Sequence, residues 1–376
     1  MFGKSIKLFT LFGFKVEIDI SWFILAILIV WSLAQGLFPY YYKDLSNASY
    51  WWMGVAGAVG LFVSIIAHEF MHSLIARNEG LPIKGITLFI FGGVAHMEDE
   101  PPSARTEFSM AVAGPITSIV LGILFYGIAL AGRSYAWPQT ITAVFSYLGV
   151  INWVLAGFNL LPAFPLDGGR ILRSVLWGVH KDLRRATKTA SRIGIGFSIL
   201  FMLIGAIQFL SGNFVGGIWI FVIGMFLQGA SRTSYRQLLI RQSLEGEPIS
   251  RFMNTNPVTV PLTTTIEELV EKYMYRHHFK MFPVVDNGKL IGCVTTKDIK
   301  EIPRSEWSTK RVKDLHLTCS DKNTVDPDTD AVKVLAHLHR NQISRLLVAK
   351  QGRLVGIVTL RDIMQFLSIK LDLENY

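Results

Sequence analysis

Two histidines and a glutamate occur at a spacing that suits a metal ion, inside an apolar stretch of the chain. Residues 65–74 read IIAHEFMHSL, so His68 and His72 are four positions apart and Glu69 follows the first. On a helix, side chains at i and i+4 project from one face, so both imidazoles can bind the same ion. Imidazole suits zinc, and a catalytic zinc keeps one position for water. Glu69 could then take a proton from that water and later donate it to a leaving amine.

The surroundings argue against a chance occurrence of this pattern. In a charge-rich helix of a soluble protein, a His-Glu-x-x-His run can arise without any function. Here the neighbours are apolar enough to lie in lipid, where each ionisable group costs roughly 3 kcal/mol at the bilayer centre. Function or mutual pairing is needed to explain why three such groups are kept, and we favour a catalytic metal.

A catalytic zinc takes a third protein ligand, and the best candidate is Asp167. Residues 159–170 read NLLPAFPLDGGR and follow an apolar run. Their prolines and glycines break a helix and would let the carboxylate turn inward. The same residues would also suit an ordinary helix end with a turn. Chain topology favours the ligand, because the apolar runs that carry the two motifs cross in the same direction and bring Asp167 to the depth of the histidines.

Long apolar runs must position these residues. The chain has 376 residues, of which 51% are hydrophobic and 17% are charged, whereas soluble domains carry about 25% charged residues. A helix needs about 20 apolar residues to cross a bilayer, and the sequence predicts six such helices. Their approximate bounds are 20–38, 53–77, 107–131, 139–162, 193–211 and 214–230. The last two are separated only by Ser-Gly-Asn and should form a tight helical hairpin.

Lysine and arginine in the short loops indicate the orientation. The opposite loops hold little more than Lys43 and Arg133, so we expect both termini and the C-terminal part in the cytosol, with the helices in the cell membrane. A net charge of +9 then fits an anionic membrane surface better than a nucleic acid. No cleavable signal peptide is expected, because charged residues interrupt the first apolar run. The basic loop after the fourth run contains Arg170, Arg173, Lys181, Arg184, Arg185, Lys188 and Arg192.

Two segments near the membrane have a β-like pattern. Lys7–Asp19 has two short runs around Phe12-Gly13, which predicts a hairpin at the membrane interface before the first span. Ile83–Glu98 is rich in β-branched and aromatic residues and is too short to cross as a helix. Irregular backbone at this depth needs cover from protein or a watery cavity. An interfacial loop would also fit, but we favour a re-entrant hairpin that lines the histidine site, and we leave His96 out of the metal set.

The C-terminal part contains an internal repeat. MFPVVDNGKLIGCVTTKDI at 281–299 matches RLLVAKQGRLVGIVTLRDI at 345–363. Each copy follows an amphipathic helical pattern, at Ile266–His277 and Ala331–Arg340, so each unit should run helix, strand, turn, strand, helix. The two cysteines, Cys293 and Cys319, both lie in this part and form no metal motif. They suit a reducing cytosol.

The membrane half resembles the site-2 protease family of intramembrane zinc metalloproteases. The resemblance rests on His68-Glu69-x-x-His72 and on Asn159-x-x-Pro-x-x-Pro-x-Asp167-Gly168. It implies that the two histidines and the aspartate bind one zinc, that Glu69 activates water, and that Asn159 helps to hold the substrate or its oxyanion. The Gly92-Gly93 segment is similar to the membrane-associated β-hairpin of the family. No PDZ-like insertion is evident, so the chain looks like the six-span branch with cytosolic CBS domains.

The repeat resembles a pair of CBS domains, with the signatures Gly-x-Val-Thr-x-x-Asp at 292–298 and 356–362. In that family the threonine approaches phosphate and the aspartate accepts from ribose hydroxyls of adenine nucleotides. The resemblance therefore implies ATP or AMP as a regulatory ligand, and a homodimer formed through the pair. A purely structural pair that mediates dimerisation is the alternative. The implied nucleotide-binding residues are Thr295, Asp298, Thr359 and Asp362.

These observations predict a polytopic α-helical membrane domain with a short membrane-associated β-hairpin, followed by an α/β CBS pair. The predicted domains are 1–240, 241–305 and 306–376. The favoured function is hydrolysis of a peptide bond in or near a transmembrane segment of a single-pass or signal-anchored regulatory protein. The alternatives are a CBS-regulated metal-ion transporter and a catalytically inactive scaffold. Glu69 discriminates among them, because a site that only binds an ion does not need a glutamate beside its first histidine.

Overall fold

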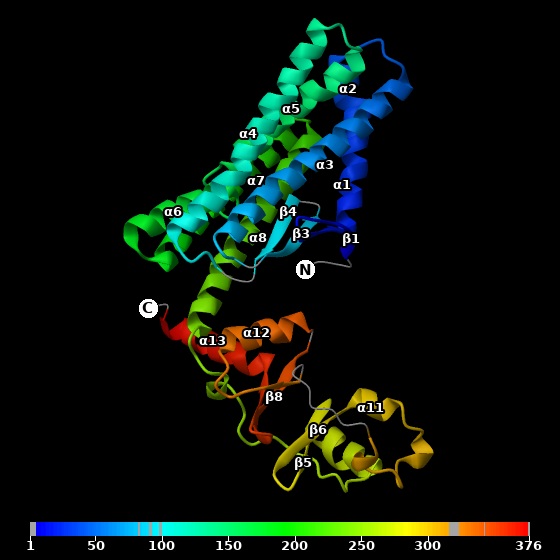
Figure 1. Ribbon diagram of the computed structural model, residues 1–376, viewed down its shortest axis with the longest axis vertical. Helices are drawn as coiled ribbons and strands as arrows, with labels where there is room; N and C mark the ends of the chain where they lie inside the picture. The colour runs from blue at the N-terminus through cyan, green and yellow to red at the C-terminus, as the bar shows by residue number, and fades with distance from the viewer. Residues whose placement is uncertain are drawn as a thin grey trace. The chain divides into compact units, whose positions relative to one another are not determined.

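The computed structural model describes residues 5–81, 83–89, 92–97, 100–315, 323–341 and 343–374. The chain divides into two compact units, Met1–Arg236 and Gln237–Tyr376 (Figure 1), called here the membrane unit and the C-terminal unit. Each unit has its own hydrophobic clusters.

Six helices among the described residues are long and apolar enough to cross a membrane, as predicted. Most extend beyond the predicted apolar runs because their polar ends continue the helix. The fourth instead ends at Asn159, short of the predicted 162. The helices are α1 Ile20–Ser32, continued by a π-helical turn Leu33–Leu37 and by α2 Phe38–Tyr41, then α3 Asn47–Asn78, α4 Ala104–Ser134, α5 Gln139–Asn159, α7 Leu183–Leu210 and α8 Phe214–Leu244.

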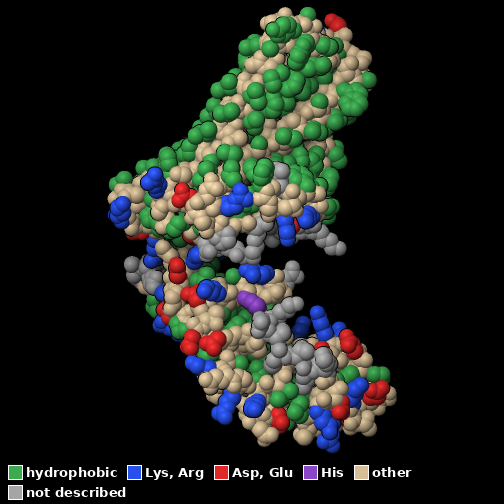
Figure 2. All heavy atoms as spheres, in the orientation of Figure 1, with side chains coloured by type: hydrophobic (Ala, Val, Ile, Leu, Met, Phe, Trp, Pro, Cys, Tyr) green, Lys and Arg blue, Asp and Glu red, His purple; other side chains and the backbone are tan. Residues whose placement is uncertain are grey.

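The surface of these helices is apolar, as a lipid-facing surface must be. Figure 2 shows hydrophobic side chains over the visible face of the membrane helices, with lysines and arginines gathered toward one end. Ile27 and Val120 are 70% and 57% exposed and would be in water in a soluble protein. This exposure fits the membrane location that the composition predicts.

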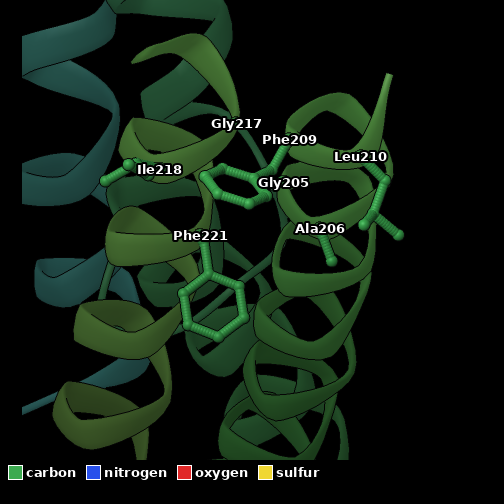
Figure 3. A pocket seen from close by; sticks show the side chains of 7 residues that line it. All are labelled: Gly205, Ala206, Phe209, Leu210, Gly217, Ile218 and Phe221. Atoms are coloured by element: carbon green, nitrogen blue, oxygen red, sulfur yellow. The ribbon is translucent and has the colours of Figure 1, made fainter. Parts of the chain in front are cut away.

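The α7–α8 hairpin closes through the predicted Ser211–Asn213 turn, where Gly212 has a φ of +90°. The two helices approach closely at Gly205 and Gly217, because a Cβ on either residue would lie 2.7 Å from the carbonyl oxygen of the other. Small residues allow this kind of close contact between membrane helices. A groove along the hairpin is lined by apolar residues only (Figure 3), so it offers no group for chemistry.

Both predicted hairpins are present, but they form one sheet rather than two separate features. The sheet has the order β1-β2-β3-β4, with antiparallel outer pairs and a parallel β2–β3 pair in the middle. The sequence could not show this pairing, because it joins residues 70 positions apart, from Lys15 opposite Gly85 to Ile18 opposite Leu88. The strands are β1 Ser5–Leu11, β2 Phe14–Asp19, β3 Ile83–Phe89 and β4 Gly92–Met97; Glu98 lies outside the described residues.

The sheet packs against α3, the helix that carries the histidines. Its buried side chains are Val16, Ile18, Ile86 and Leu88, and Phe62, Ile65, Ile66 and Phe70 of α3 pack on them. In Figure 1 the sheet and helix α6, Asp167–His180, lie toward the same end of the helix bundle. The sheet therefore covers the part of α3 that holds the metal-binding pattern.

The C-terminal unit has the predicted repeat of helix, strand, turn, strand and helix. Leu244, Ile249 and Phe252 come before the helix of the first repeat but are buried in the core of the second. Cys293 is half-buried, and its Sγ atom lies 3.9 Å from Asn323 Nδ2, whereas Cys319 lies outside the described residues. The first repeat has a continuous helical segment, α9 Ile266–Glu268, a π-helical stretch Leu269–Met274 and α10 Tyr275–His277, followed by β5 Met281–Asp286, β6 Lys289–Thr295 and α11 Thr296–Lys300. The second has β7 Thr324–Val325, α12 Ala331–Arg340, β8 Arg345–Lys350, β9 Arg353–Thr359 and α13 Leu360–Glu374. Short 3-10 turns occur at Ile249–Arg251, Arg304–Glu306 and Val312–Asp314.

Candidate active site

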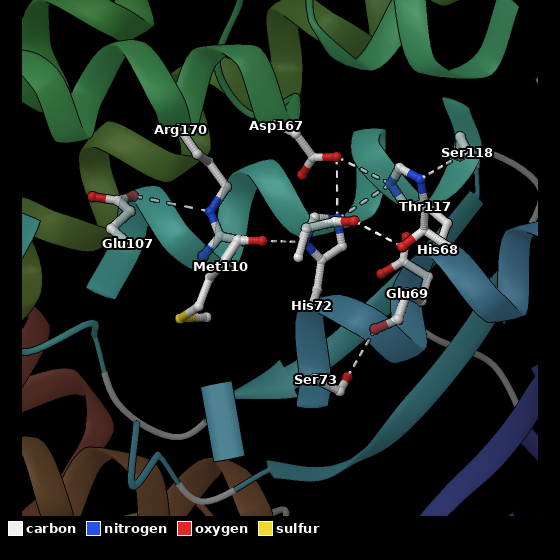
Figure 4. A network of polar contacts seen from close by, with 11 residues as sticks. His68, Glu69, His72, Ser73, Glu107, Met110, Thr117, Ser118, Asp167 and Arg170 are labelled. Carbon is white, nitrogen blue, oxygen red and sulfur yellow. Dashed lines mark hydrogen bonds and ion pairs between the residues drawn. The ribbon is translucent and has the colours of Figure 1, made fainter. Parts of the chain in front are cut away.

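The two histidines of the pattern lie on one face of α3, as their spacing predicts. Both are buried, with exposed fractions of 3% for His68 and 6% for His72. Their Nε2 atoms are 3.2 Å apart, and Figure 4 shows both rings turned toward Asp167. The helix therefore presents two ligand atoms to one point.

Asp167 is the first residue of α6. The sequence predicts a break in the fourth span at this point but does not predict the helix that follows. The Oδ2 atom of Asp167 lies 3.0 Å from His68 Nε2 and 3.1 Å from His72 Nε2. Residues 160–166 bring α6 back against the bundle. The glycines after Asp167 are needed for this return, because a Cβ on Gly168 or Gly169 would lie 2.2 Å from backbone atoms of that connection.

The three side chains fit a single small metal ion. Zinc has ligand bonds of about 2.0–2.2 Å and tetrahedral geometry, so its ligand atoms lie about 3.3–3.6 Å apart. The three atoms here are only slightly closer together, at 3.0 to 3.2 Å. Within the described ranges, His68, His72 and Asp167 form the one group of three His, Cys, Asp or Glu side chains that could hold a metal ion. Two nitrogens and one carboxylate oxygen, buried together, suit zinc.

Helix α4 orients both imidazoles from the side opposite the ligand atoms. His72 Nδ1 donates to the carbonyl oxygen of Met110 at 2.6 Å, and His68 Nδ1 lies 2.8 Å from Ser118 Oγ. A donating Nδ1 leaves the lone pair on Nε2, which is the state that binds a metal. Gly114 lies between these two contacts, and a Cβ there would be 2.2 Å from His72 Nε2 and 2.5 Å from His68 Nε2. The absence of a side chain at this position keeps the ligand atoms free.

Glu69 points from α3 toward strand β4. It is half-buried, and a Cβ on Gly93 would lie 2.4 Å from Glu69 Cγ. Gly93 therefore lets the edge strand approach the glutamate closely. This places the predicted hairpin beside the histidine cluster; the side chain of His96 in β4 is outside the described part of the chain.

Asn159, the fifth residue of the predicted site, is the last residue of α5 and is half-buried. Among the described residues, the hydrogen bonds that join the histidines and Asp167 do not include it. The connection from 160 to 166 links it to Asp167. Its role in holding a substrate stays a prediction.

Two polar pairs around the site were missed from the sequence. Glu107 of α4 and Arg173 of α6 form a buried ion pair, and Asn152 of α5 donates to Ser64 Oγ of α3 at 3.0 Å. A carboxylate and an amide within apolar runs are signals for such pairs, because polar groups in the membrane seek partners. In the sequence, Arg173 indicates only the orientation of the chain in the membrane.

The four candidate nucleotide-binding residues form helix caps in the C-terminal unit. Thr295 Oγ1 donates to Asp298 Oδ2 at 2.8 Å, and Thr359 Oγ1 donates to Asp362 Oδ2 at 2.7 Å. The backbone N–H groups of both threonines bond to the same carboxylates. These pairs start α11 and α13, so each has a structural role whether or not a nucleotide binds.

Comparison with known proteins identifies the families of both parts of the chain. Residues 56–135 and 128–203 match peptidase family M50, and residues 249–304 and 312–369 match the CBS domain. A protein of Mycobacterium tuberculosis (strain H37Rv) named as the zinc metalloprotease Rip3 is 32% identical over 367 residues, which cover 97% of this chain and 93% of that one. The chain belongs to peptidase family M50, the site-2 protease family. The predicted family, CBS pair and enzyme class are thereby confirmed: the protein is a multi-pass membrane metalloendopeptidase, and its family implies zinc.

A second curated relative matches nearly the whole chain, and a solved structure matches part of it. A protein of Synechocystis sp. (strain PCC 6803), also named as a zinc metalloprotease, is 33% identical over 370 residues, covering 97% of this chain and 96% of that one. The solved structure of a site-2 protease from Methanocaldococcus jannaschii is 29% identical and covers 61% of this chain and 94% of that one, with a TM-score of 0.43. The similarity to the two named metalloproteases thus extends across both the M50 part and the CBS pair.

Proposed function

We propose that this M50 protein hydrolyses a peptide bond in or near a transmembrane segment of a single-pass or signal-anchored regulatory protein. The observation that carries the proposal is the convergence of two imidazole nitrogens and one carboxylate oxygen within 3.2 Å among membrane helices. Such buried ionisable groups are costly in a bilayer and mark a functional site. Their position inside the helix bundle suits a substrate that is itself embedded in the membrane.

In this proposal His68, His72 and Asp167 hold one zinc ion per chain. A zinc ion held by these residues would supply Lewis acidity and would lower the pKa of a bound water molecule. Glu69 adjoins the first ligand in sequence and is half-buried, so its carboxylate can accept a proton from water and deliver it to the leaving amine. The side-chain amide of Asn159 donates to the substrate or to the oxyanion that forms from its carbonyl group. Met110 and Ser118 keep the histidine rings in place.

The sheet can present the substrate to this site. Peptide bonds in a transmembrane helix are shielded by the hydrogen bonds of the helix itself, so cleavage requires local unwinding. Strand β4 is at the edge of the sheet order β1-β2-β3-β4 and lies next to Glu69 at Gly93. An unwound segment can add to such an edge through backbone hydrogen bonds. This arrangement would bring an extended peptide beside the glutamate.

The CBS pair is proposed to bind an adenine nucleotide, ATP or AMP, and to regulate cleavage. Binding at Thr295, Asp298, Thr359 and Asp362 would require their cap hydrogen bonds to accommodate phosphate and ribose groups. Coupling requires two conformations with different nucleotide affinity. Cleavage rates of the full-length protein at saturating ATP, ADP and AMP test the idea, and identical rates in all conditions would contradict regulation. A homodimer through the pair would appear in light scattering of the detergent-solubilised protein.

We also propose that the protein resides in the cell membrane with both termini and the CBS pair in the cytosol. The basic loops between the spans support this orientation. Cysteine-accessibility labelling of intact cells tests it. A cysteine introduced near Lys43 should react with an impermeant reagent, whereas Cys293 should not. The reverse pattern would contradict the orientation.

The catalytic proposal is tested with a Glu69→Gln variant. The purified wild-type protein should cleave a reconstituted transmembrane substrate found by trapping with the variant in membrane extract. The variant should retain zinc and lose cleavage, since glutamine keeps the shape of the side chain but cannot accept the proton. Unimpaired cleavage by Glu69→Gln would refute the proposed role of the glutamate. Zinc flux without cleavage in the wild-type protein would instead favour the transporter.

A further inference from the structure

One stripe of α4 contacts both histidines and the helix that carries Asp167. Met110 accepts from His72, Gly114 leaves space beside both rings, and Ser118 contacts His68. One turn before Met110, Glu107 contacts α6, the helix that begins with Asp167. Positions 107, 110, 114 and 118 repeat at intervals of three and four and therefore lie on one helix face. Figure 4 shows Met110 beside His72 and Ser118 beside His68, with Glu107 farther from the histidines and next to Arg170.

The contact between Glu107 and α6 is a deeply buried ion pair. Glu107 is 0% exposed and Arg173 is 4% exposed. Arg173 Nε donates to Glu107 Oε1 at 2.6 Å, and Arg173 Nη2 contacts the same oxygen. Arg170 Nε lies 3.9 Å from this oxygen, and Arg173 also lies over the ring of Phe164 at 4.8 Å. Both partners are thus fixed in direction as well as in distance.

Burying this ion pair between two helices carries a large desolvation cost. Removing two charges from water costs several kcal/mol per ion, and apolar residues of similar volume often stabilise a fold equally well. In addition, Glu107 Oε2 is buried and has no hydrogen-bond partner among the described residues. Stability alone therefore does not account for the pair, whereas the fixed geometry of a guanidinium–carboxylate contact would account for a role in alignment.

Asp167 benefits from such alignment, because it lies at the very start of its helix. It is the first residue of α6, and Leu166, the N-cap residue, makes no side-chain capping bond. Metal sites tolerate ligand displacements of only about 0.2 Å. Arg173 lies less than two turns after Asp167 on the same helix. A fixed contact at Arg173 therefore limits both the rotation of α6 about its axis and its shift along that axis, and so sets the position of Asp167.

We propose that Glu107 and Arg173 are positioning residues that set the Asp167 carboxylate at binding distance from the zinc held by His68 and His72. The inference rests on the proposed zinc site. Loss of the pair would let α6 shift relative to α4 while the two histidines stay in place on α3. The site would then bind metal through two good ligands and one misplaced ligand, with lower affinity and altered geometry.

The experiment compares purified full-length proteins in detergent: wild type, Glu107→Gln, and the double variant Glu107→Gln/Arg173→Met, which removes both buried charges. Arg133→Gln is the matched control, since Arg133 is also on α4 and donates to Ser146 of α5, away from the site. Zinc affinity is measured by competition with a chelator, and ligand geometry by the visible spectrum of the cobalt-substituted protein. Thermal unfolding of the metal-free proteins reports stability.

We expect zinc affinity to fall about 10- to 100-fold in Glu107→Gln and in the double variant, the range found when groups behind metal ligands are removed. The cobalt spectrum should change in both, while Arg133→Gln should match wild type. If the single variant does not fold, the double variant and Arg173→Lys, which keeps the charge but not the two-nitrogen contact, provide the result. Wild-type zinc affinity and cobalt spectrum in the double variant would overturn the proposal, even if its thermal stability were lower. A wild-type protein that binds no zinc would refute the proposed site itself, which is a distinguishable outcome.

Discussion

Substitution of Gly114 by alanine should abolish tight zinc binding with little effect on the rest of the fold. The added Cβ would lie 2.2 Å from His72 Nε2, 2.5 Å from His68 Nε2 and 2.6 Å from His72 Cε1. Cβ atoms essentially never come within 3.0 Å of such atoms, so the His72 ring and helix α4 must move apart by about 0.8 Å or more. This is several times the displacement of about 0.2 Å that a metal site tolerates.

The displaced ring would also lose its 2.6 Å bond to the Met110 carbonyl. Two ligands change together, so the loss of zinc affinity should reach at least about 100-fold, the upper end for groups that only support a ligand. Overpacking of the site should lower the free energy of unfolding by about 1–3 kcal/mol. Zinc content after purification and chelator competition measure the first effect, and thermal unfolding measures the second.

Gly127→Ala is the matched control, because it lies on the same helix and a Cβ there meets no atom within 4 Å. It should bind zinc as wild type does, and its stability should be equal or higher by up to about 1 kcal/mol, since alanine is the better helix former. Wild-type zinc affinity in Gly114→Ala would show that the histidines do not converge where the structure places them, and would refute the geometry of the site.

Three further predictions concern the supports of the site and the C-terminal unit. Ser118→Ala removes the 2.8 Å partner of His68 Nδ1 and should weaken zinc binding about tenfold by chelator competition; unchanged affinity would exclude this support. Arg77→Met removes the 2.7 Å hydrogen bond to the Phe12 carbonyl, so limited proteolysis should cut the β1–β2 turn faster than in wild type. Equal cleavage rates would show that Arg77 does not hold the turn in place. Asp362→Ala removes a helix cap and should destabilise the C-terminal unit by about 1 kcal/mol in thermal unfolding; an unchanged unfolding temperature would show that the cap is dispensable.

Sequence alone predicts the site residues whose positions follow from the local helical repeat or from the end of an apolar run. His68 and His72 share a helix face because of their spacing, and the apolar run around them forms a helix as expected. Asp167 could be found because it is a carboxylate at the end of an apolar run, in a stretch that also contains prolines and glycines. The repeats at 281–299 and 345–363 similarly show their strands and turns through alternation and Asn-Gly or Gln-Gly pairs.

The remaining features depend on tertiary contacts that leave no local pattern. Gly114 looks like any other glycine in an apolar helix, and its importance comes from two rings on another helix. The parallel pairing of β2 with β3 joins the two hairpins through the buried residues Val16 and Ile86, which are far apart in the sequence. Helix α6 could not be predicted from the sequence. The prolines before it indicate where α5 ends, but they do not indicate that another helix begins.

The central claim is that His68, His72 and Asp167 together hold one zinc ion. Metal analysis combined with X-ray absorption at the zinc edge tests it most directly on the purified full-length protein. We predict one zinc per chain, coordinated by two imidazole nitrogens and by oxygen, and a loss of this zinc in a His68→Ala/His72→Ala variant. Sulfur in the coordination shell, or an equal amount of zinc in the variant that lacks both histidines, would contradict the account.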